Sequence, residues 1–494
     1  MKQVLRNILR VFYISIVGAL LIPLVQYKFN VLNEEPLSGE YKKQNVELPV
    51  LSLNNLRNGS FQSSMDRFWQ NELGCRNWLI RINNQLNYSV FDQANANGTI
   101  VCGENVLITE GDIKSYLGSD FVGKEKMDEM LDKAKFISDS LRKNGIPFVF
   151  MVAPSKASVY KDQIPSKYFS MYNSGITNYD YFVKGVSERN IRIFDAKKII
   201  LEDESYFDYP VFPKNGVHWS GNTVAKITDT LMEYLSTELR LNVPSIELGK
   251  GEETILNYRY TDYDIGEAMN LLWNISDDVL HYPTVKFVNS RQTKPNLLGV
   301  GDSFIQSFYG FYPVLDSVFS QHSNLWYYHK TVGWPDRLKK YHIKTQELDL
   351  GLELQKRDLV IVEMTEENLK MTGYDFIDEV YDHFTGKNIV NAEKQPLYDK
   401  LSADPEINKR ATEIAPVLGY TIPQMKDALI MNKVKNEWLI NFDYEAEVQR
   451  IMVAIKSTPK WYGQIKEKAI RRNESVEKTL RDDAIWVVNK NLGN

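Results

Sequence analysis

The stretch Asn296–Phe304, NLLGVGDSF, decides the fold of this 494-residue chain. Its apolar first half is typical of a strand buried on both faces of a parallel sheet. A tight turn, Gly301-Asp302-Ser303, follows the strand and leads into a helix. A Ser at this place puts its hydroxyl at the rim where α/β proteins bind ligands, beside free N–H groups that could hold an oxyanion. Asp-Ser after a strand is also a routine helix N-cap, so the motif alone does not establish catalysis.

Helices and strands alternate on either side of this stretch. An apolar helical stripe between Met127 and Leu141 ends at Gly145, and the continuous apolar run IPFVFMVAP follows it directly. The same order returns in helices near 179–189 and 222–239 and in strands at 191–195, 324–328 and 358–364. This alternation predicts an α/β fold with a mainly parallel sheet flanked by helices. From about residue 400 the sequence is charged and helical in period, which predicts a helical C-terminal extension.

A second motif lies in the loop Phe212–Ser220, FPKNGVHWS, just before the helix at Asn222. A Pro/Asn/Gly loop here presents His218, and imidazole is the usual base that activates a Ser hydroxyl. A loop His satisfied by backbone carbonyls is the alternative. His218 and Ser303 are 85 positions apart, so any proximity would come from the fold. We expect both side chains in one cleft at the carboxyl end of the sheet.

The N-terminus has the pattern of a membrane segment. Lys2, Arg6 and Arg10 precede 17 uncharged residues, 11–27, which is at the short end for a transmembrane helix. The basic residues before it favour a cytoplasmic N-terminus and an extracytoplasmic body. A cleaved signal peptide is the alternative, but LLIPLVQYKFN offers no small-x-small cleavage site, which favours an uncleaved anchor. Residues 29–60 are polar without sustained periodicity and are interpreted as a tether.

Composition narrows the function classes. With 43% hydrophobic and 25% charged residues the chain can form a large folded body, and a net charge of −5 gives no footprint for nucleic acid. The six His and two Cys form no H-E-x-x-H or C-x-x-C pattern, so a metal site is not expected. Cys75 and Cys102 could form a disulfide worth about 3 kcal/mol, or remain two buried thiols.

The order of the two motifs, an H-W-S loop first and G-D-S-F later, resembles the circularly permuted SGNH hydrolase-like domain of the AlgX and AlgJ type alginate O-acetyltransferases. Other stretches resemble that family too: Arg76–Phe91 followed by a hairpin, Val152–Lys156 with Tyr160 after it, and the strand VIVEMTEENL. The resemblance spans roughly residues 60–385. It implies a stub and anchor at 1–28, a tether at 29–60, an SGNH domain at 61–385 and a helical extension at 386–494.

The resemblance also implies roles for residues. Ser303 would be the nucleophile and His218 the base, with Asp302 in support. The family usually has an Asp two residues before the His, where this chain has Gly216, and the adjacent Asn215 cannot supply a charge. Three readings stay open: another carboxylate (Asp208, Asp195 or Glu363) replaces it, the enzyme uses a Ser–His dyad, or the domain is non-catalytic.

The function implied by the resemblance is acetyl transfer to hydroxyl groups of a cell-surface or exported polysaccharide. An integral-membrane O-acyltransferase would relay the acetyl donor, and no soluble cofactor would be needed. A carbohydrate acetyl-esterase with the same Ser–His pair is one alternative. A non-catalytic glycan-binding or scaffold protein is the other, because of Gly216.

Overall fold

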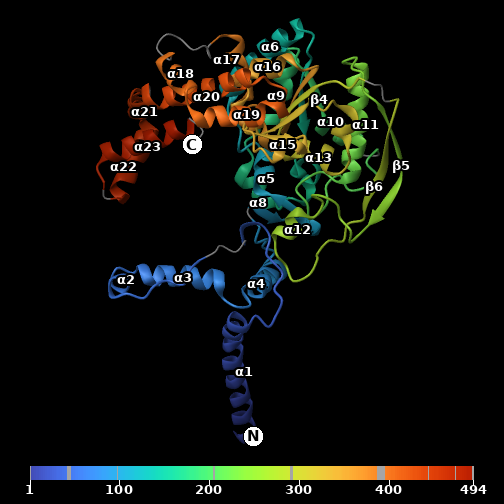
Figure 1. The fold of residues 1–494 in the computed structure, drawn as a ribbon. Helices are drawn as coiled ribbons and strands as arrows, with labels where there is room; N and C mark the ends of the chain where they lie inside the picture. The colour runs from blue at the N-terminus through green and yellow to red at the C-terminus, as the bar shows by residue number, and fades with distance from the viewer. Residues whose placement is uncertain are drawn as a thin grey trace. The chain divides into compact units, whose positions relative to one another are not determined.

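The computed structural model of the chain forms two compact units (Figure 1). The first unit is Met1–Ser323 with Asp358–Ile377, and the second is Asn324–Arg357 with Asp378–Asn494. The structure describes residues 2–41, 46–96, 98–203, 206–289, 293–386, 395–442, 444–472 and 474–491.

The first unit is built on parallel strands in the order β4 (Arg192–Asp195), β3 (Phe148–Ala153), β10 (Leu359–Thr365) and β7 (Leu297–Gly301). Every residue of β3, β7 and β10 is buried, as their continuous apolar runs require in a sheet covered on both faces. The predicted mainly parallel α/β fold is therefore confirmed. Because the strands are parallel, the residues that follow Ala153, Gly301 and Thr365 gather at one edge.

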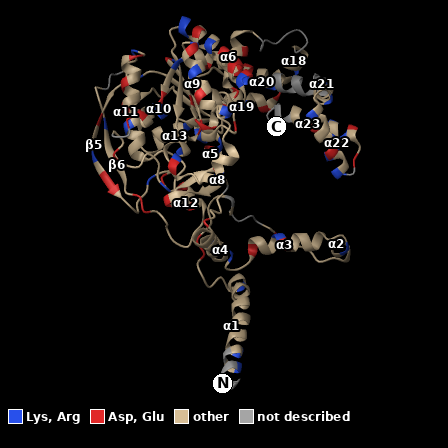
Figure 2. Ribbon diagram, turned by 180° about the vertical axis from the view of Figure 1, so that it is seen from behind, with Lys and Arg blue, Asp and Glu red and all other residues tan. Residues whose placement is uncertain are grey.

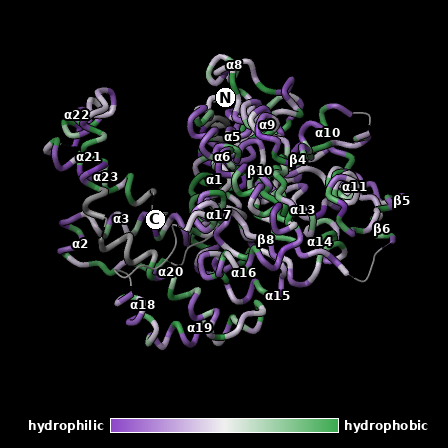
Figure 3. Tube along the Cα trace, turned by 90° about the horizontal axis from the view of Figure 1, so that it is seen from above, coloured by the Kyte–Doolittle hydropathy of each residue, from purple (hydrophilic) through white to green (hydrophobic). Residues whose placement is uncertain are grey.

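The helices around this sheet follow the predicted periodicity. The predicted stripe is buried in α6 (Lys124–Lys143); its residues are Met127, Met130, Leu131, Ala134, Ile137 and Leu141. Gly145, just after the helix, has a positive φ of +76°, a conformation that ends the helix. A Cβ at Gly185 of α9 (Asn178–Glu188) would be 2.4 Å from Leu131, so α6 and α9 touch closely. The hydropathy along each helix can be followed in Figure 3. The other helices of the first unit's body are α5 (Glu110–Leu117), α7 (Lys156–Val159), α8 (Ser166–Tyr172), α10 (Ala196–Glu202), α11 (Gly221–Thr237), α13 (Ser303–Gly310) and α14 (Val314–Val318).

One part of the first unit was not predicted. Between α11 and β7 the chain forms a long antiparallel pair, β5 (Ser245–Thr254) and β6 (Leu280–Val288), with the short helix α12 (Asp264–Ala268) between them in sequence. The side chains of β5 are mostly exposed and the pairing shifts between Gly249 and Glu252. No clear alternation of apolar and polar residues marks such a strand in the sequence. A smaller pair, β1 (Thr99–Val101) and β2 (Leu107–Thr109), is the predicted hairpin.

The N-terminal helix α1 (Lys2–Phe29) contains a segment, Leu9–Phe29, that is long and apolar enough to cross a membrane. Its charged residues lie toward its two ends, with Lys28 in the last turn, and the stretch between them carries no charge (Figure 2). Its last turn packs against the turn between α3 (Ser60–Glu72) and α4 (Arg76–Phe91), where a Cβ at Gly74 would be 2.1 Å from the carbonyl oxygen of Pro23. The ring of Tyr27 lies edge-on to Phe68 of α3.

The segment after α1 was predicted to be a tether, but part of it is held to the body. The carboxylate of Glu34 accepts hydrogen bonds from the backbone N–H groups of Cys75 (2.7 Å) and Asn77 (3.0 Å), at the start of α4. Asn270 accepts from Ser38 N and donates to Ser38 O. The short helix α2 (Leu53–Arg57) lies farther along this segment. The domain boundaries drawn from the sequence stay a prediction.

The two cysteines are buried, unbridged thiols in the described structure. Cys75 precedes α4, and Cys102 packs in an apolar cluster with Ile108 and Ile113. Burial raises the pKa of the Cys102 thiol to about 11.

The second unit is mostly helical, as predicted for the C-terminal region. It contains the antiparallel pair β8 (Asn324–Tyr327) and β9 (Thr331–Trp334). Glu353 and Arg357 form an ion pair in its interior, and Tyr420 donates to Glu353. The helices in this part of the chain are α15 (Asp336–Lys339), α16 (Leu350–Gln355), α17 (Phe376–Phe384), α18 (Gln395–Ser402), α19 (Pro405–Leu418), α20 (Ile422–Phe442), α21 (Tyr444–Ser457), α22 (Pro459–Arg472) and α23 (Val476–Asn491).

Candidate active site

The turn that carries Ser303 is fixed by the buried carboxylate of Asp302. Asp302 caps α13, whose first residue is Ser303, by accepting from Phe304 N at 2.9 Å. Its other oxygen accepts from four donors at the end of β10 and just beyond it: Thr365 N (3.0 Å), Thr365 Oγ1 (2.9 Å), Asn368 Nδ2 (2.7 Å) and Tyr374 OH (3.0 Å). A buried carboxylate is tolerated when its oxygens are satisfied in this way. Asp302 therefore joins the turn to the central strand, which is a supporting role.

A second acid lies beneath the same turn. Glu363 of β10 accepts a hydrogen bond from Asp302 N at 3.1 Å, and a Cβ at Gly301 would be 2.5 Å from its Oε2. Burial and the charge of Asp302 raise the pKa of Glu363 well above its usual value. Glu363 thus lies directly beneath the turn that carries Ser303. It does not replace the acid that is missing at Gly216.

The loop that carries His218 is clamped by a buried lysine. Lys156, at the start of α7 after β3, is 1% exposed. Its Nζ donates to three backbone carbonyls of the loop, Pro213 O (2.6 Å), Lys214 O (2.8 Å) and Gly216 O (2.8 Å). The hydroxyl of Tyr160 donates to a fourth, Phe212 O, at 2.6 Å. The Val152–Lys156 segment and Tyr160 therefore fix the backbone of the His218 loop.

His218 is paired with a carboxylate that the sequence did not single out. Its Nδ1 is 2.9 Å from Oδ2 of Asp264, the first residue of α12. The other oxygen of Asp264 accepts from Val217 N at 2.8 Å, so the acid holds the loop backbone as well as the ring. The imidazole packs against the Phe304 ring with 4.9 Å between centroids. Phe304 directly follows Ser303, so the ring lies against the first turn of α13.

The remaining nitrogen of His218, Nε2, is buried and has no hydrogen-bond partner among the described residues. A group with this environment can accept a proton from a nearby hydroxyl. In serine enzymes the carboxylate on one imidazole nitrogen sets the tautomer that leaves the other nitrogen free as the base. The described part of the chain has no group of three or more His, Cys, Asp or Glu side chains that could hold a metal ion.

The carboxylates expected from the sequence are engaged elsewhere. Asp208, named as the substitute acid, forms an ion pair with Lys226. Asp195 caps α10 and accepts from Tyr179 OH at 2.8 Å. Asn215 is buried, and its backbone carbonyl oxygen accepts a hydrogen bond from Gly266 N of α12. The carboxylate that contacts the imidazole is thus Asp264, from outside the loop, while Asp208 is bound to Lys226.

The structure explains why Gly216 stands at the usual acid position. A Cβ at Gly216 would be 3.0 Å from the carbonyl oxygen of Thr261 and 3.1 Å from that of Asp262. The segment that leads to α12 thus passes against Gly216 and delivers Asp264 into the adjacent space. The neighbouring Asp262 is buried, which raises its pKa to about 8, and it accepts from Tyr282 OH at 2.7 Å. No local sequence signal connects Asp264 to His218, because the two belong to different segments.

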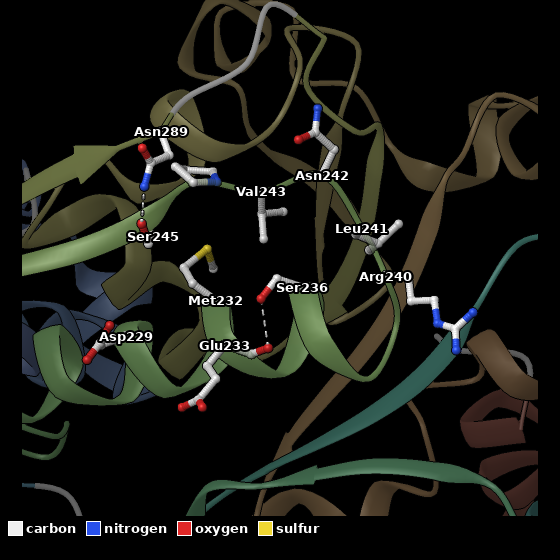
Figure 4. A pocket seen from close by; sticks show the side chains of 11 residues that line it. Asp229, Met232, Glu233, Ser236, Arg240, Leu241, Asn242, Val243, Ser245 and Asn289 are labelled. Atoms are coloured by element: carbon white, nitrogen blue, oxygen red, sulfur yellow. Dashed lines mark hydrogen bonds between the residues drawn. The ribbon is translucent and has the colours of Figure 1, made fainter.

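Of two cavities in the first unit, one borders the pair of His218 and Asp264 and the other does not. One of about 290 Å³ borders Asp264 and Val217, and Gly39 and Tyr41 of the segment after α1 form part of its wall. The other, of about 600 Å³, lies where α11 ends and β5 begins (Figure 4). Its lining includes Glu233, Arg240 and Asn289 but none of Ser303, His218 and Asp264. The smaller cavity is therefore the one adjacent to the candidate site.

Comparison with known proteins supports the resemblance found in the sequence. Residues 116–256 match the family model of the SGNH hydrolase-like domain of acetyltransferase AlgX. The matched segment contains Lys156 and His218 and ends before Asp264 and Ser303. No curated protein sequence matches the chain. The family model therefore bears out the predicted resemblance over residues 116–256.

The chain is also similar to three solved structures. The O-acetyltransferase domain of Pseudomonas putida AlgJ is 17% identical with a TM-score of 0.39, covering 58% of this chain and 99% of that one. Pseudomonas aeruginosa AlgX is 12% identical with a TM-score of 0.38, covering 57% and 67%. Bacillus cereus PatB1 is 11% identical with a TM-score of 0.32, covering 54% and 95%. At these identities and scores no residue role is transferred from them.

The Lys156 clamp predicts a pH dependence of stability. Burial lowers the pKa of Lys156 from 10.5 to about 7, although Asp264, Asp112 and Asp278 favour its charged form. Between these values the native chain holds fewer protons than the unfolded chain, so this group makes the free energy of unfolding rise with pH. Its contribution is fully present above about pH 10.5 and is lost as pH falls through about 7.

We expect Lys156→Met to lack this rise. Denaturation at several pH values between about 6 and 10 would measure it as the difference in slope between wild type and variant. Lys143→Met, on the exposed end of α6, is the matched control and should keep the wild-type slope. Parallel slopes for wild type and Lys156→Met would contradict the prediction.

Proposed function

We propose that the first unit is an extracytoplasmic O-acetyltransferase that uses Ser303, His218 and Asp264. The observation that carries the proposal is the pairing of Asp264 with Nδ1 of His218 at 2.9 Å, with the imidazole packed on the residue after Ser303. The match to the AlgX acetyltransferase domain supports the same reaction class. The contact between Asp264 and His218 favours this proposal over the non-catalytic alternative.

The proposed reaction has two half-reactions. In the first, Nε2 of His218 takes the proton from Ser303 as its Oγ attacks the acetyl carbonyl of the donor, and the leaving group departs with that proton. In the second, His218 takes the proton of a sugar hydroxyl, whose oxygen attacks the acetyl-Ser303 ester and releases the serine. Asp264 stabilises the imidazolium in both.

The substrates follow from the family resemblance. We propose a polysaccharide as the acceptor and an integral-membrane O-acyltransferase as the source of acetyl groups. The identity of the polymer is not part of the proposal. Hydrolysis of the same acyl-enzyme would make the protein an acetyl-esterase, and products formed with and without a sugar acceptor separate the two activities.

We also propose that α1 is an uncleaved membrane anchor. Its last turn packs on Gly74, and Tyr27 contacts the ring of Phe68, so this end of the helix is part of the folded body. A cleaved signal peptide has no need of such contacts. With Lys2, Arg6 and Arg10 before the span, the body would lie outside the cytoplasm.

Acyl-enzyme trapping tests the nucleophile. Incubation with an activated acetyl ester should add one acetyl group to the wild-type chain, mapped by mass spectrometry to the peptide with Ser303. Ser303→Ala should lose this label because no other hydroxyl is activated by His218. Ser307→Ala, one turn farther along α13 and buried, is the matched control and should keep it. Equal labelling of wild type and Ser303→Ala would refute the nucleophile.

Substitution of the acid tests the triad. Asp264→Asn keeps the shape of the side chain but removes the charge that stabilises the imidazolium, so the acetylation rate should fall by about 10²–10⁴-fold. Asp208→Asn should leave the rate within a factor of about two, because its partner is the remote Lys226. The opposite ranking of the two variants would return the acid role to Asp208.

Membrane fractionation tests the anchor. The full-length chain should remain in the membrane fraction after carbonate extraction, because α1 offers an uncharged span and its end is held by the body. The N-terminal residue of the mature protein is the complementary measurement. A soluble extracytoplasmic protein that begins near about residue 30 would show that the segment is a cleaved signal.

A further inference from the structure

Helix α4 buries polar side chains and exposes apolar ones. Its buried residues are polar: Asn84 is 1% exposed and Gln85 is 5% exposed. Asn84 Nδ2 donates to Met269 O at 2.7 Å, and Gln85 Oε1 accepts from Leu272 N at 3.2 Å. The polar face of α4 is thus held to the body by hydrogen bonds.

The opposite face of α4 is apolar and open. Leu79, Ile82, Leu86 and Val90 recur at spacings of three and four residues, which places them on one side of the helix. These four side chains and those at the two ends of the helix are between 43% and 63% exposed. We call the set the α4 stripe: Trp78, Leu79, Ile82, Leu86, Val90 and Phe91. A contiguous exposed patch of this kind marks an interaction surface.

We propose that the α4 stripe lies in the interfacial layer of the lipid bilayer that α1 crosses. The proposal rests on the anchor role of α1 given above. Its main support is continuity with the anchor, since Gly74, just before α4, packs against Pro23 and Tyr27 at the end of the apolar span. The start of α4 is therefore held where α1 would leave the hydrocarbon layer.

The composition of the stripe fits a lipid surface. Amphipathic helices that lie in the membrane plane present Trp, Phe and Leu on the buried side and are held by a polar opposite face. Trp78 and Phe91 lie at the two ends of the stripe. Trp69, whose ring contacts Tyr27 near the end of α1, is a further exposed aromatic residue. In the described residues, exposed large apolar side chains gather before position 92 and are scattered afterwards.

This placement connects the membrane to the candidate site. The polar face of α4 holds the backbone at Met269 and Leu272, directly after α12. Asp264 at the start of α12 holds His218. A bilayer contact along α4 would therefore keep the site at a fixed height and orientation above the membrane surface, near a membrane-embedded acetyl donor.

Site-specific quenching tests the proposal on the full-length chain. Leu86→Cys carries an environment-sensitive fluorophore, and the chain is placed singly in phosphatidylcholine nanodiscs. The native thiols are buried and should not react, which labelling of the wild type checks. We expect lipid-borne nitroxide to quench the Leu86 label several-fold more than a label at Lys143→Cys on α6. Iodide in solution should show the reverse order.

A third label, at Val17→Cys in α1, separates the two proposals that are involved. Suppose that lipid nitroxide quenches the Val17 label but iodide reaches the Leu86 label as readily as the Lys143 label. That result would overturn the interfacial role of α4 and leave the anchor intact. Protection of Leu86 only in native membranes would also overturn it, and would assign the stripe to a protein partner. If Val17 itself is open to iodide, the anchor is wrong, and the α4 proposal falls with it.

Discussion

Lys156 extends from the end of β3 into a ring of three carbonyl oxygens that belong to the loop carrying His218. A loop with Pro213, Asn215 and Gly216 has few side chains with which to hold its own shape. The buried Nζ takes over this task by giving the carbonyls donors that water would otherwise provide. Tyr160 and Asp264 fix the two ends of the same loop, at Phe212 and Val217. The position of the imidazole therefore depends on contacts from β3 and α12, which lie far from it in sequence.

The other half of the site follows a different principle. Asp302 and Glu363 are neighbours at the carboxyl ends of β7 and β10, where the backbone N–H of Asp302 donates to the Glu363 carboxyl group. Asp302 collects five hydrogen bonds, whereas Glu363 is buried with one oxygen that lacks a partner among the described residues. Burial and the neighbouring Asp302 together raise the pKa of Glu363 well above its usual value. The turn that presents Ser303 is thus held rigidly by groups that take no part in the proton transfer.

The sequence was sufficient for the parts of the fold that have a strong period. Continuous apolar runs predicted β3, β7 and β10, the stripe from Met127 to Leu141 predicted α6, and the chain order of two short motifs pointed to the family that residues 116–256 resemble. It was insufficient where the structure depends on contacts between distant segments. Asp264 sits on a five-residue helix within a hairpin of exposed residues, and only the fold brings it to His218. Asp208, one of three carboxylates considered from the sequence, is closer to His218 along the chain but is bound to Lys226.

Gly216 is packed against the segment formed by β5, α12 and β6, which we call the hairpin insert. An acid at position 216 would need a Cβ within about 3 Å of two carbonyl oxygens, and its charge would face their negative ends. The insert that creates this crowding also supplies the acid, through α12. The same insert is tied by its Met269–Leu272 backbone to the polar face of α4, and α4 begins where α1 ends. Because Asp264 lies on α12, hydrogen bonds link the imidazole to the part of the chain nearest the apolar N-terminal helix. A change along α4 has a physical route to the orientation of Asp264, which an acid within the His loop would not provide.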